Sequence, residues 1–276
     1  MRRLLAACLA GGLGLLGGLA VADEAPRRVL SMNLCTDQLA MLLAAPGQLV
    51  SVSRLSQDPH SSAMADRAAL LPANDGLAEQ VFLMQPDLVV TGAYTAPATV
   101  ALLRRLGKRV ETFAPETDFD DLRANMLRMG RVLGREAEAR AAVARFDADL
   151  AALTGEDDGS RPRAAIYEAN GYSPGPDSLA GQVVAAAGFA GLGAELGLGA
   201  GGTIPLEVLM LAEPDLVVIG QPYPGASRAE EVLTHPGLRA LAARGPTAMV
   251  MDRDWVCGTP HVLDALARLR AAREAL

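Results

Sequence analysis

The sequence predicts an α/β protein of two similar lobes with parallel sheets, joined by a long rigid helix, and three observations support this fold class. The stretch EQVFLMQPDLVVTG (residues 79–92) returns as EVLMLAEPDLVVIG (residues 207–220), with eight of fourteen positions identical. Each copy reads as a helix followed by a strand, and a second helix and strand come after it. This alternation is typical of a parallel sheet. A helical segment, residues 117–155, separates the two copies. A duplicated lobe on either side of a connecting segment follows from this arrangement.

Each half opens with a predicted strand, Arg28–Met32 in the first and Arg163–Tyr167 in the second, and a helical pattern follows each strand (DQLAMLLAA and SLAGQVVAAAG). In the first copy of the repeat, Glu79–Met84 predicts a short helix, which Pro86 ends. The continuous apolar run Asp87–Val90 then predicts a strand buried on both faces, as in a parallel sheet.

A second helix and strand follow in both halves. The strands are expected at Arg109–Phe113 and at Ala248–Met251, after helices that end at glycine. The glycine-rich stretch GLGAELGLGAGG (residues 191–202) opens no strand-to-helix dinucleotide turn, so we expect it to be a loop.

The connecting segment predicts a stiff rod. Thr117 or Asp118 caps its start, Gly134 interrupts it, and Arg135–Leu153 carries an apolar face at helical spacing. Nineteen helical residues would span about 28 Å. We therefore expect an N-terminal lobe at 23–116, a connecting helical segment at 117–155 and a C-terminal lobe at 156–276.

The N-terminus has the pattern of a secretory signal peptide, residues 1–22. Arg2 and Arg3 precede a glycine-rich apolar run, and Ala20–Ala22 is a small-x-small cleavage site. The alternative is a membrane anchor, because about 19 apolar residues could just span a bilayer. Cys8 stands in a lipoprotein-like box too close to the start for an apolar core to precede it, so we do not expect lipid anchoring there.

The charge of the mature chain excludes two classes of partner. Loss of Arg2 and Arg3 with the signal peptide leaves 23 of the 25 basic residues against 32 acidic ones, a net charge of −9. Such a chain is not expected to bind nucleic acid or an anionic membrane surface. Nor does the sequence contain a GxSxG, GxxxxGK[ST] or HExxH motif of an enzyme. The three histidines are not clustered, so a dedicated zinc or manganese site is not expected.

Five stretches carry a resemblance that covers the mature chain: RVLSMNLCTDQL, AEQVFLMQPDLVVTG, ANGYSPGPDSLAGQVVAAAGF, TIPLEVLMLAEPDLVVIG and DWVCGTPHVLDALARL. In this order, with the rod between the lobes, the chain resembles the periplasmic substrate-binding proteins of importers of vitamin B12, ferric siderophores and haem. The resemblance implies a rigid, monomeric class III binding protein in the periplasm, without a resident cofactor, that delivers its ligand to the permease of an ABC transporter in the inner membrane.

The expected ligand is a metal chelate, either a ferric siderophore or a haem-type iron complex, held between the lobes. Cobalamin is the alternative within the family, and a secreted cysteine-dependent enzyme is the alternative outside it. The family docks on its permease through an acidic side chain at the tip of each lobe. By position, Asp66 and Glu195 are the candidates here, against the reading that both are ordinary solvated acids.

The aromatic side chains are few, so their positions are informative. Ligands of open α/β sheets lie beyond the carboxyl ends of the strands. Tyr94, Tyr172 and Trp255 fall at predicted strand ends, and Tyr223 follows another. Each would offer a broad apolar contact with a polar edge, or would instead be a boundary residue of the core.

Three cationic or metal-ligating side chains are further candidates. Arg54 follows the second strand of the first lobe and would suit an anionic ferric chelate, unless it forms a surface ion pair. His60 lies in a loop and His261 opens the last helix; either could touch a metal centre as a neutral imidazole. A structural or solvated role is the alternative for both.

Cys35 and Cys257 lie at strand-to-helix turns, one in each lobe. They form a disulfide that ties the lobes, if their Cα atoms come within about 7 Å. Alternatively they are thiols that line the site, or small buried residues that never meet. The sequence leaves all three readings open.

Overall fold

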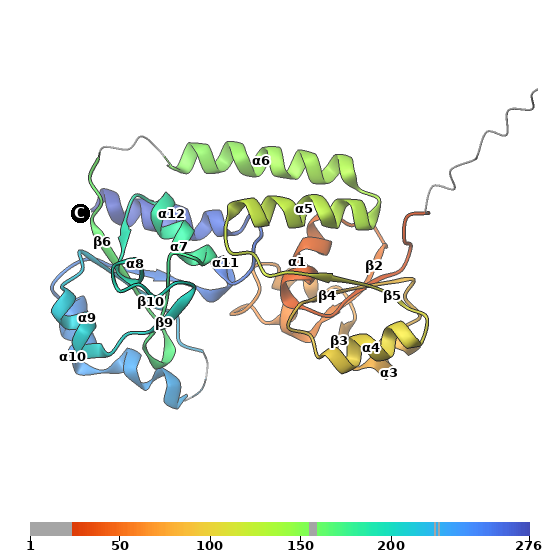
Figure 1. Ribbon diagram of the computed structural model, residues 1–276, viewed down its shortest axis with the longest axis horizontal. Helices are drawn as coiled ribbons and strands as arrows, with labels where there is room; N and C mark the ends of the chain where they lie inside the picture. The colour runs from red at the N-terminus through yellow and green to blue at the C-terminus, as the bar shows by residue number, and fades with distance from the viewer. Residues whose placement is uncertain (1–23, 155–158, 224, 226) are drawn as a thin grey trace, which may run out of the picture.

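The computed structural model describes residues 24–154, 159–223, 225 and 227–276. Two α/β lobes lie side by side, and two long antiparallel helices run along one side of them (Figure 1). The predicted signal peptide and Cys8 lie outside the described residues. Within the described part of the chain, no helix has the length and apolar character needed to cross a membrane.

The N-terminal lobe is built on a five-stranded, fully parallel sheet with the order β3-β2-β1-β4-β5. The interior strand β4 is buried on both faces over its first four residues, as the continuous apolar run predicts. The strands are β1 (Val29–Ser31), β2 (Leu49–Ser53), β3 (Ala73–Asn74), β4 (Leu88–Gly92) and β5 (Arg109–Phe113).

Helices cover both faces of this sheet. One face packs on α3 and α4 through a small apolar cluster that includes Leu30, Val89 and Leu103. The other face packs on α1 and on the first long helix. The helices of this lobe are α1 (Leu34–Leu43), α2 (Ala65–Ala68), α3 (Ala78–Leu83) and α4 (Pro97–Arg105), with a 3₁₀ turn at Arg54–Gln57.

The C-terminal lobe repeats the plan with a four-stranded parallel sheet, order β11-β10-β6-β8, and a separate antiparallel pair β7-β9. The strands are β6 (Arg163–Tyr167), β7 (Tyr172–Pro174), β8 (Ala190–Gly191), β9 (Gly201–Thr203), β10 (Leu216–Gly220) and β11 (Thr247–Val250). The helices are α7 (Leu179–Ala186), α8 (Leu192–Glu195), α9 (Leu206–Ala212), α10 (Pro236–Ala242), α11 (Asp252–Trp255) and α12 (Val262–Glu274). Two 3₁₀ segments occupy Ala169–Gly171 and Arg228–Thr234.

The glycine-rich stretch 191–202 is not the plain loop that the sequence predicts. It contains α8 and the first residues of β9, which pairs with β7. The glycines permit this close packing: a Cβ at Gly193 would lie 2.5 Å from the carbonyl oxygen of Pro174. The glycine content therefore reflects close backbone contacts, which a loop prediction overlooks.

The connecting segment is a helical hairpin, α5 (Phe119–Leu133) and α6 (Glu136–Thr154). Asp118 caps α5 by accepting from the Asp121 amide at 2.8 Å, and Gly134 ends it with a φ of 69°. The predicted rod corresponds to α6 alone, since α5 packs on the N-terminal lobe while α6 also reaches α12 of the other lobe.

The core is continuous between the lobes. One cluster of buried side chains joins Val29 in the first sheet, Met126 in α5, Phe146 in α6, Leu266 in α12 and Leu216 in the second sheet. Separation of the lobes along this side would expose apolar area, so the hairpin holds them at a fixed spacing.

Candidate functional site in the interlobe cleft

Each sheet contains one point where the strand order reverses, and such a switch point is where open α/β sheets bind ligands. In the N-terminal lobe the switch point lies between β1 and β4, and in the C-terminal lobe between β6 and β10. The strand pairing shows which residues correspond at the two switch points. Val29 pairs with Leu88 and Ala164 with Leu216, and Leu88 and Leu216 are equivalent in the repeat. Positions after β1 can therefore be matched to positions after β6.

The N-terminal switch point opens into a pocket of about 330 Å³. Its wall includes Asn33 after β1, Gly92 at the end of β4, Glu116 after β5, and Val256 from the other lobe. Three apolar or aromatic side chains are exposed at this wall: Tyr94 (87%), Val256 (53%) and Leu55 (51%). A pocket of this size, apolar with a few polar groups and shared by two lobes, is typical of a small-molecule site.

Asn33 and Gly92 shape this pocket together. The Asn33 side chain caps α1 by accepting from the amides of Cys35 and Thr36, at 3.1 and 3.3 Å. A Cβ at Gly92 would lie 2.8 Å from Asn33 Cγ, so any larger residue there would require the capping side chain to move. The absence of a side chain keeps the end of β4 open toward the pocket.

The C-terminal switch point is acidic. Glu168 follows β6 directly, and Asp252 begins α11 after β11. Burial, and next the charge of Asp252, raise the pKa of Glu168 to about 7. Burial also raises the pKa of Asp252, against a hydrogen bond from the Tyr223 hydroxyl that lowers it. At neutral pH the Glu168 carboxyl is therefore divided between its protonated and ionised forms.

A disulfide and three polar contacts tie the lobes across the cleft. Cys35 and Cys257 are bonded, with Cα atoms 5.0 Å apart, so the structure selects the disulfide among the three readings. The Gly258 amide donates to Glu116 Oε2 at 3.3 Å, and Arg253 donates to the Pro59 carbonyl at 3.1 Å. The hydroxyls of Ser61 and Tyr223 lie 3.3 Å apart. Because Cys35 also lines the pocket, the disulfide is part of the site wall.

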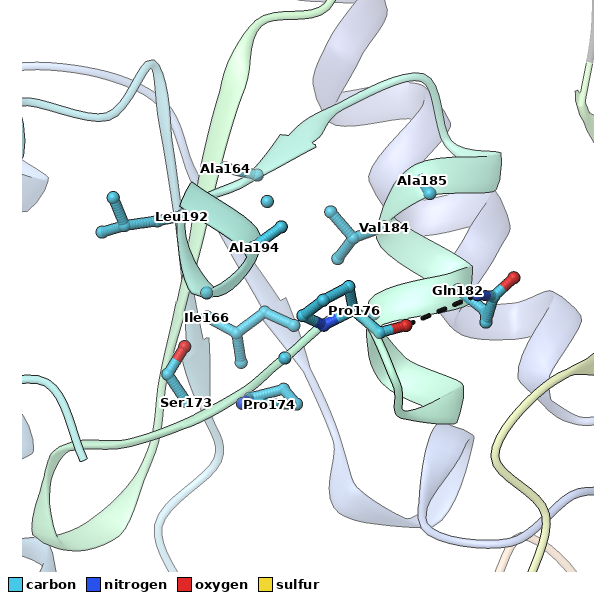
Figure 2. Close-up of a pocket in the computed structure, with 14 residues that line it drawn as sticks. Ala164, Ile166, Ser173, Pro174, Pro176, Gln182, Val184, Ala185, Leu192 and Ala194 are labelled. Carbon is cyan, nitrogen blue, oxygen red and sulfur yellow. Dashed lines mark hydrogen bonds between the residues drawn. The ribbon is translucent and has the colours of Figure 1, made fainter. Parts of the chain in front are cut away.

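A second cavity lies inside the C-terminal lobe (Figure 2). It measures about 110 Å³ between β6, α7 and α8, and apolar side chains such as Ile166, Val184 and Leu192 line it. Ser173 Oγ is buried there without a hydrogen-bond partner among the described residues. No residue proposed from the sequence as a ligand contact lines this cavity, and it is too small for a metal chelate.

Comparison with known proteins agrees with this arrangement. Residues 29–244 match the model of a family described as periplasmic binding protein. The chain belongs to that family. A cobalamin-binding protein of Halobacterium salinarum is 26% identical over 252 residues, which cover 90% of this chain and 67% of the relative.

Two solved structures are similar to this periplasmic binding protein over nearly its whole length. A periplasmic haem-binding protein of Pseudomonas aeruginosa is 25% identical with a TM-score of 0.71, covering 90% of this chain and 92% of that one. The apo periplasmic haem-binding protein of Roseiflexus sp. RS-1 is 20% identical with a TM-score of 0.73, covering 89% and 97%. The second likeness shows the fold, which is the predicted class III architecture.

The three tyrosines proposed as ligand contacts are exposed to solvent, whereas Tyr167 and the tryptophan are buried. Tyr94 lies on the N-terminal pocket, and Tyr223 is 39% exposed beside Ser61 of the other lobe. Tyr172 is 42% exposed on β7 and lies outside both cavities. Trp255 is only 6% exposed and packs in the core cluster.

The cationic and imidazole candidates have local partners. Arg54 donates from Nε to Asp75 at 2.7 Å, which matches the surface ion pair named as its alternative. His60 stacks obliquely on Tyr223, with ring centroids 5.6 Å apart, and its Nδ1 lies 3.4 Å from Asp58. His261 stands at the start of α12, with Nδ1 3.8 Å from Asp264. In the described residues no group of three potential ligands could hold a metal ion.

The docking candidates differ from each other. Asp66 is exposed in the first turn of α2. Glu195 in α8 is bonded to Arg163 at 2.7 Å, and this contact lowers the pKa of its carboxyl. Two exposed carboxylates that the repeat itself relates, Glu79 and Glu207, stand in the first turns of α3 and α9.

Sequence reasoning missed the acidic switch point, although a signal for it existed. The strand Arg163–Tyr167 was predicted with its observed bounds, so Glu168 was already the residue at its carboxyl end. Asp252 likewise follows the predicted strand Ala248–Met251 directly. The aromatic side chains used as the signal for ligand contacts, Tyr172 and Trp255, lie a few residues further along.

Proposed function

We propose that this chain is the periplasmic solute-binding component of an ABC importer and that it captures a metal chelate in the interlobe cleft. The chelate is a ferric siderophore or a haem-type iron complex, with cobalamin as the alternative. The chain holds no resident cofactor and performs no reaction; it delivers its ligand to an inner-membrane permease. The pocket at the N-terminal switch point, closed on one side by Val256 of the other lobe, is the observation that carries this proposal.

The chemistry of the pocket supports a flat, partly apolar ligand. Tyr94, Leu55 and Val256 expose apolar area that water solvates poorly, and a chelate would cover it. The relatives named above are described as haem- and cobalamin-binding. Both ligands are metal complexes of a broad macrocycle, which is the shape that such a wall would accept.

We further propose that the cleft changes little on binding. The disulfide between Cys35 and Cys257 and the shared core under α5 and α6 both resist separation of the lobes. A ligand therefore enters a largely preformed site, which keeps the ordering cost of binding small.

Docking on the permease is proposed to use acidic side chains, one from each lobe. Asp66 and Glu195 are the pair suggested by position, and the bond from Arg163 to Glu195 weakens the case for that side chain. Glu79 and Glu207 are the pair suggested by the duplication, since a two-fold partner would meet equivalent positions on the two lobes. The two pairs can be separated by substitution.

A thermal-shift panel on the chain purified from the periplasm tests the binding proposal. The panel holds haemin, cyanocobalamin, a ferric hydroxamate and a ferric catecholate, with free Fe³⁺ and Zn²⁺ as controls. A ligand at 100 times its Kd adds about 2.7 kcal/mol to the free energy of unfolding. We expect one chelate to raise Tm and Tyr94→Ala to reduce that shift, with Leu211→Ala, exposed on α9, as the matched control. A rise in Tm with the free ions only, or no rise in Tm with any member of the panel, would overturn the assignment.

A further inference from the structure

The two switch points differ in the chemistry of the residues at their strand ends. The position equivalent to Asn33 in the C-terminal lobe is Glu168, because each stands four residues beyond a matched strand position. By the same register through β5 and β11, the position equivalent to Pro115 is Asp252. A neutral amide and a proline in one lobe thus correspond to two carboxyl groups in the other.

The two carboxyl groups converge on the end of β10. A Cβ built on Gly220 would lie 3.7 Å from Glu168 Cγ and 3.9 Å from Asp252 Oδ1, so both side chains flank this glycine. Among the described residues, Glu168 has no hydrogen-bond donor and no cation beside its carboxyl, while Asp252 has only the Tyr223 hydroxyl. Half-buried carboxyl oxygens without donors are strong acceptors that a ligand can use.

Two arginines beside residues of the cleft already have partners. Arg54 is bonded to Asp75, and Arg253 lies 3.7 Å from Asp254 while it donates to the Pro59 carbonyl of the other lobe. The wall of the N-terminal pocket also contains an acid, Glu116, whose pKa is raised by burial. An anionic ligand would therefore meet acids on both sides of the cleft.

We propose that the cleft selects an uncharged or cationic chelate with N–H donors along one edge, such as amide groups, and rejects chelates that carry carboxylates or net negative charge. The apolar face of the ligand lies on Tyr94 and Leu55, and its donor edge lies on Glu168 and Asp252. This inference rests on the proposed function, since it assumes that the ligand occupies the interlobe cleft. It narrows the class of possible ligands by their net charge and by their hydrogen-bond donors.

Calorimetric titration at pH 7.5 tests the inference with four probes. Cyanocobalamin and a neutral ferric trihydroxamate peptide carry amide groups and no net negative charge, whereas haemin carries two carboxylates and a ferric tris-catecholate is an anion. We expect an amide-bearing neutral probe to bind at least tenfold more tightly than either anion. Glu168→Gln with Asp252→Asn should weaken the neutral probe about tenfold and strengthen the anions. Glu274→Gln, which removes an exposed charge at the end of α12, is the matched control.

The pH dependence of wild-type binding gives a second readout that needs no variant. Donation to Glu168 favours its ionised form, so the affinity for the neutral probe should rise between pH 5 and pH 8, and affinity for an anion should fall. His60, Asp58, Tyr223 and Glu230 also face this region, and the variant His60→Gln separates the contribution of the imidazole from that of Glu168.

The outcomes separate the two proposals. Tightest binding of an anionic chelate, unaffected by the double substitution, would overturn the charge selection and leave the chelate receptor standing. Failure of every chelate to bind would overturn both. Equal affinity for neutral and anionic probes would also overturn the selection, because the acidic wall would then have no effect.

Discussion

The two lobes share one plan and differ at the point where they meet the cleft. In the N-terminal lobe the end of β4 passes the cap of α1 so closely that Gly92 has no room for a Cβ, and the surface beyond it is apolar. In the C-terminal lobe the equivalent Gly220 has room for a Cβ, and the carboxyl groups of Glu168 and Asp252 flank it. A duplicated scaffold thus keeps its strand register while the side chains at the strand ends diverge, which gives a two-sided cleft with unlike walls.

The largest expected effect comes from the covalent link between these walls. Cys35→Ser with Cys257→Ser should lower the free energy of unfolding by about 2–5 kcal/mol, because the disulfide closes a loop of 222 residues in the unfolded chain. Urea denaturation of the double variant and of the wild type measures this difference. Reduction of the wild type with dithiothreitol is the control for packing changes at the two sites. Identical midpoints for oxidised and reduced protein would contradict the stabilising role.

The two glycines provide a matched pair. Gly92→Ala places a methyl group 2.8 Å from Asn33 Cγ, so the side chain must move and α1 loses its cap, at about 0.5–2 kcal/mol. At Gly220 the nearest atoms are 3.7 and 3.9 Å away, which is ordinary contact, so Gly220→Ala should change stability by less than about 0.5 kcal/mol. Chemical denaturation of both variants checks the asymmetry. Equal losses would mean that the lobes are more alike at the cleft than the structure indicates.

The duplicated plan was predictable and the difference between the lobes was not. The repeat at residues 79–92 and 207–220, the buried apolar runs and the Gly134 break are local patterns, so strands such as Arg109–Phe113 and Arg163–Tyr167 were predicted with their observed bounds. The pairing of Cys35 with Cys257 and the burial of Trp255 depend on the docking of one lobe against the other. Such long-range packing produces no periodic pattern in the sequence. The helix α8 and the strand β9 in the stretch 191–202 are also too short to produce one.

A smaller effect is expected from the titration of the acidic wall. The pKa of Glu168 is about 7 in the folded protein, against a reference value of 4.5. The folded state therefore binds this proton more tightly than the unfolded state. The protonated Glu168 carboxyl contributes fully to the free energy of unfolding below pH 4.5, and this contribution is lost as the pH rises to about 7. Glu168→Gln should remove this decline. The free energy of unfolding of the variant should therefore rise relative to that of the wild type between pH 4.5 and about 7.

Urea midpoints at pH 5, 6, 7 and 8 measure this growth for Glu168→Gln. Glu274→Gln is the control, because it removes an exposed carboxyl outside the cleft. A constant difference between Glu168→Gln and wild type over the whole range would show that the carboxyl is as well solvated in the folded protein as in the unfolded chain. The N-terminal equivalent, Asn33, carries no ionisable group, so the contribution of Glu168 has no counterpart at that position.

The smallest effect per residue is expected at the outer surface, where the lobes should again act alike. A single exposed carboxylate contributes about 0.2–1 kcal/mol to an ion pair, so Glu79→Gln and Glu207→Gln should each weaken permease binding only a few-fold, and the double variant should multiply the two losses. Binding of the loaded protein to permease in nanodiscs, at 0.05 and 0.3 M salt, measures them. Asp66→Asn with Glu195→Gln is the competing pair. If that pair has the larger effect, docking follows the positions first suggested by the resemblance and does not use the repeat-related helices α3 and α9.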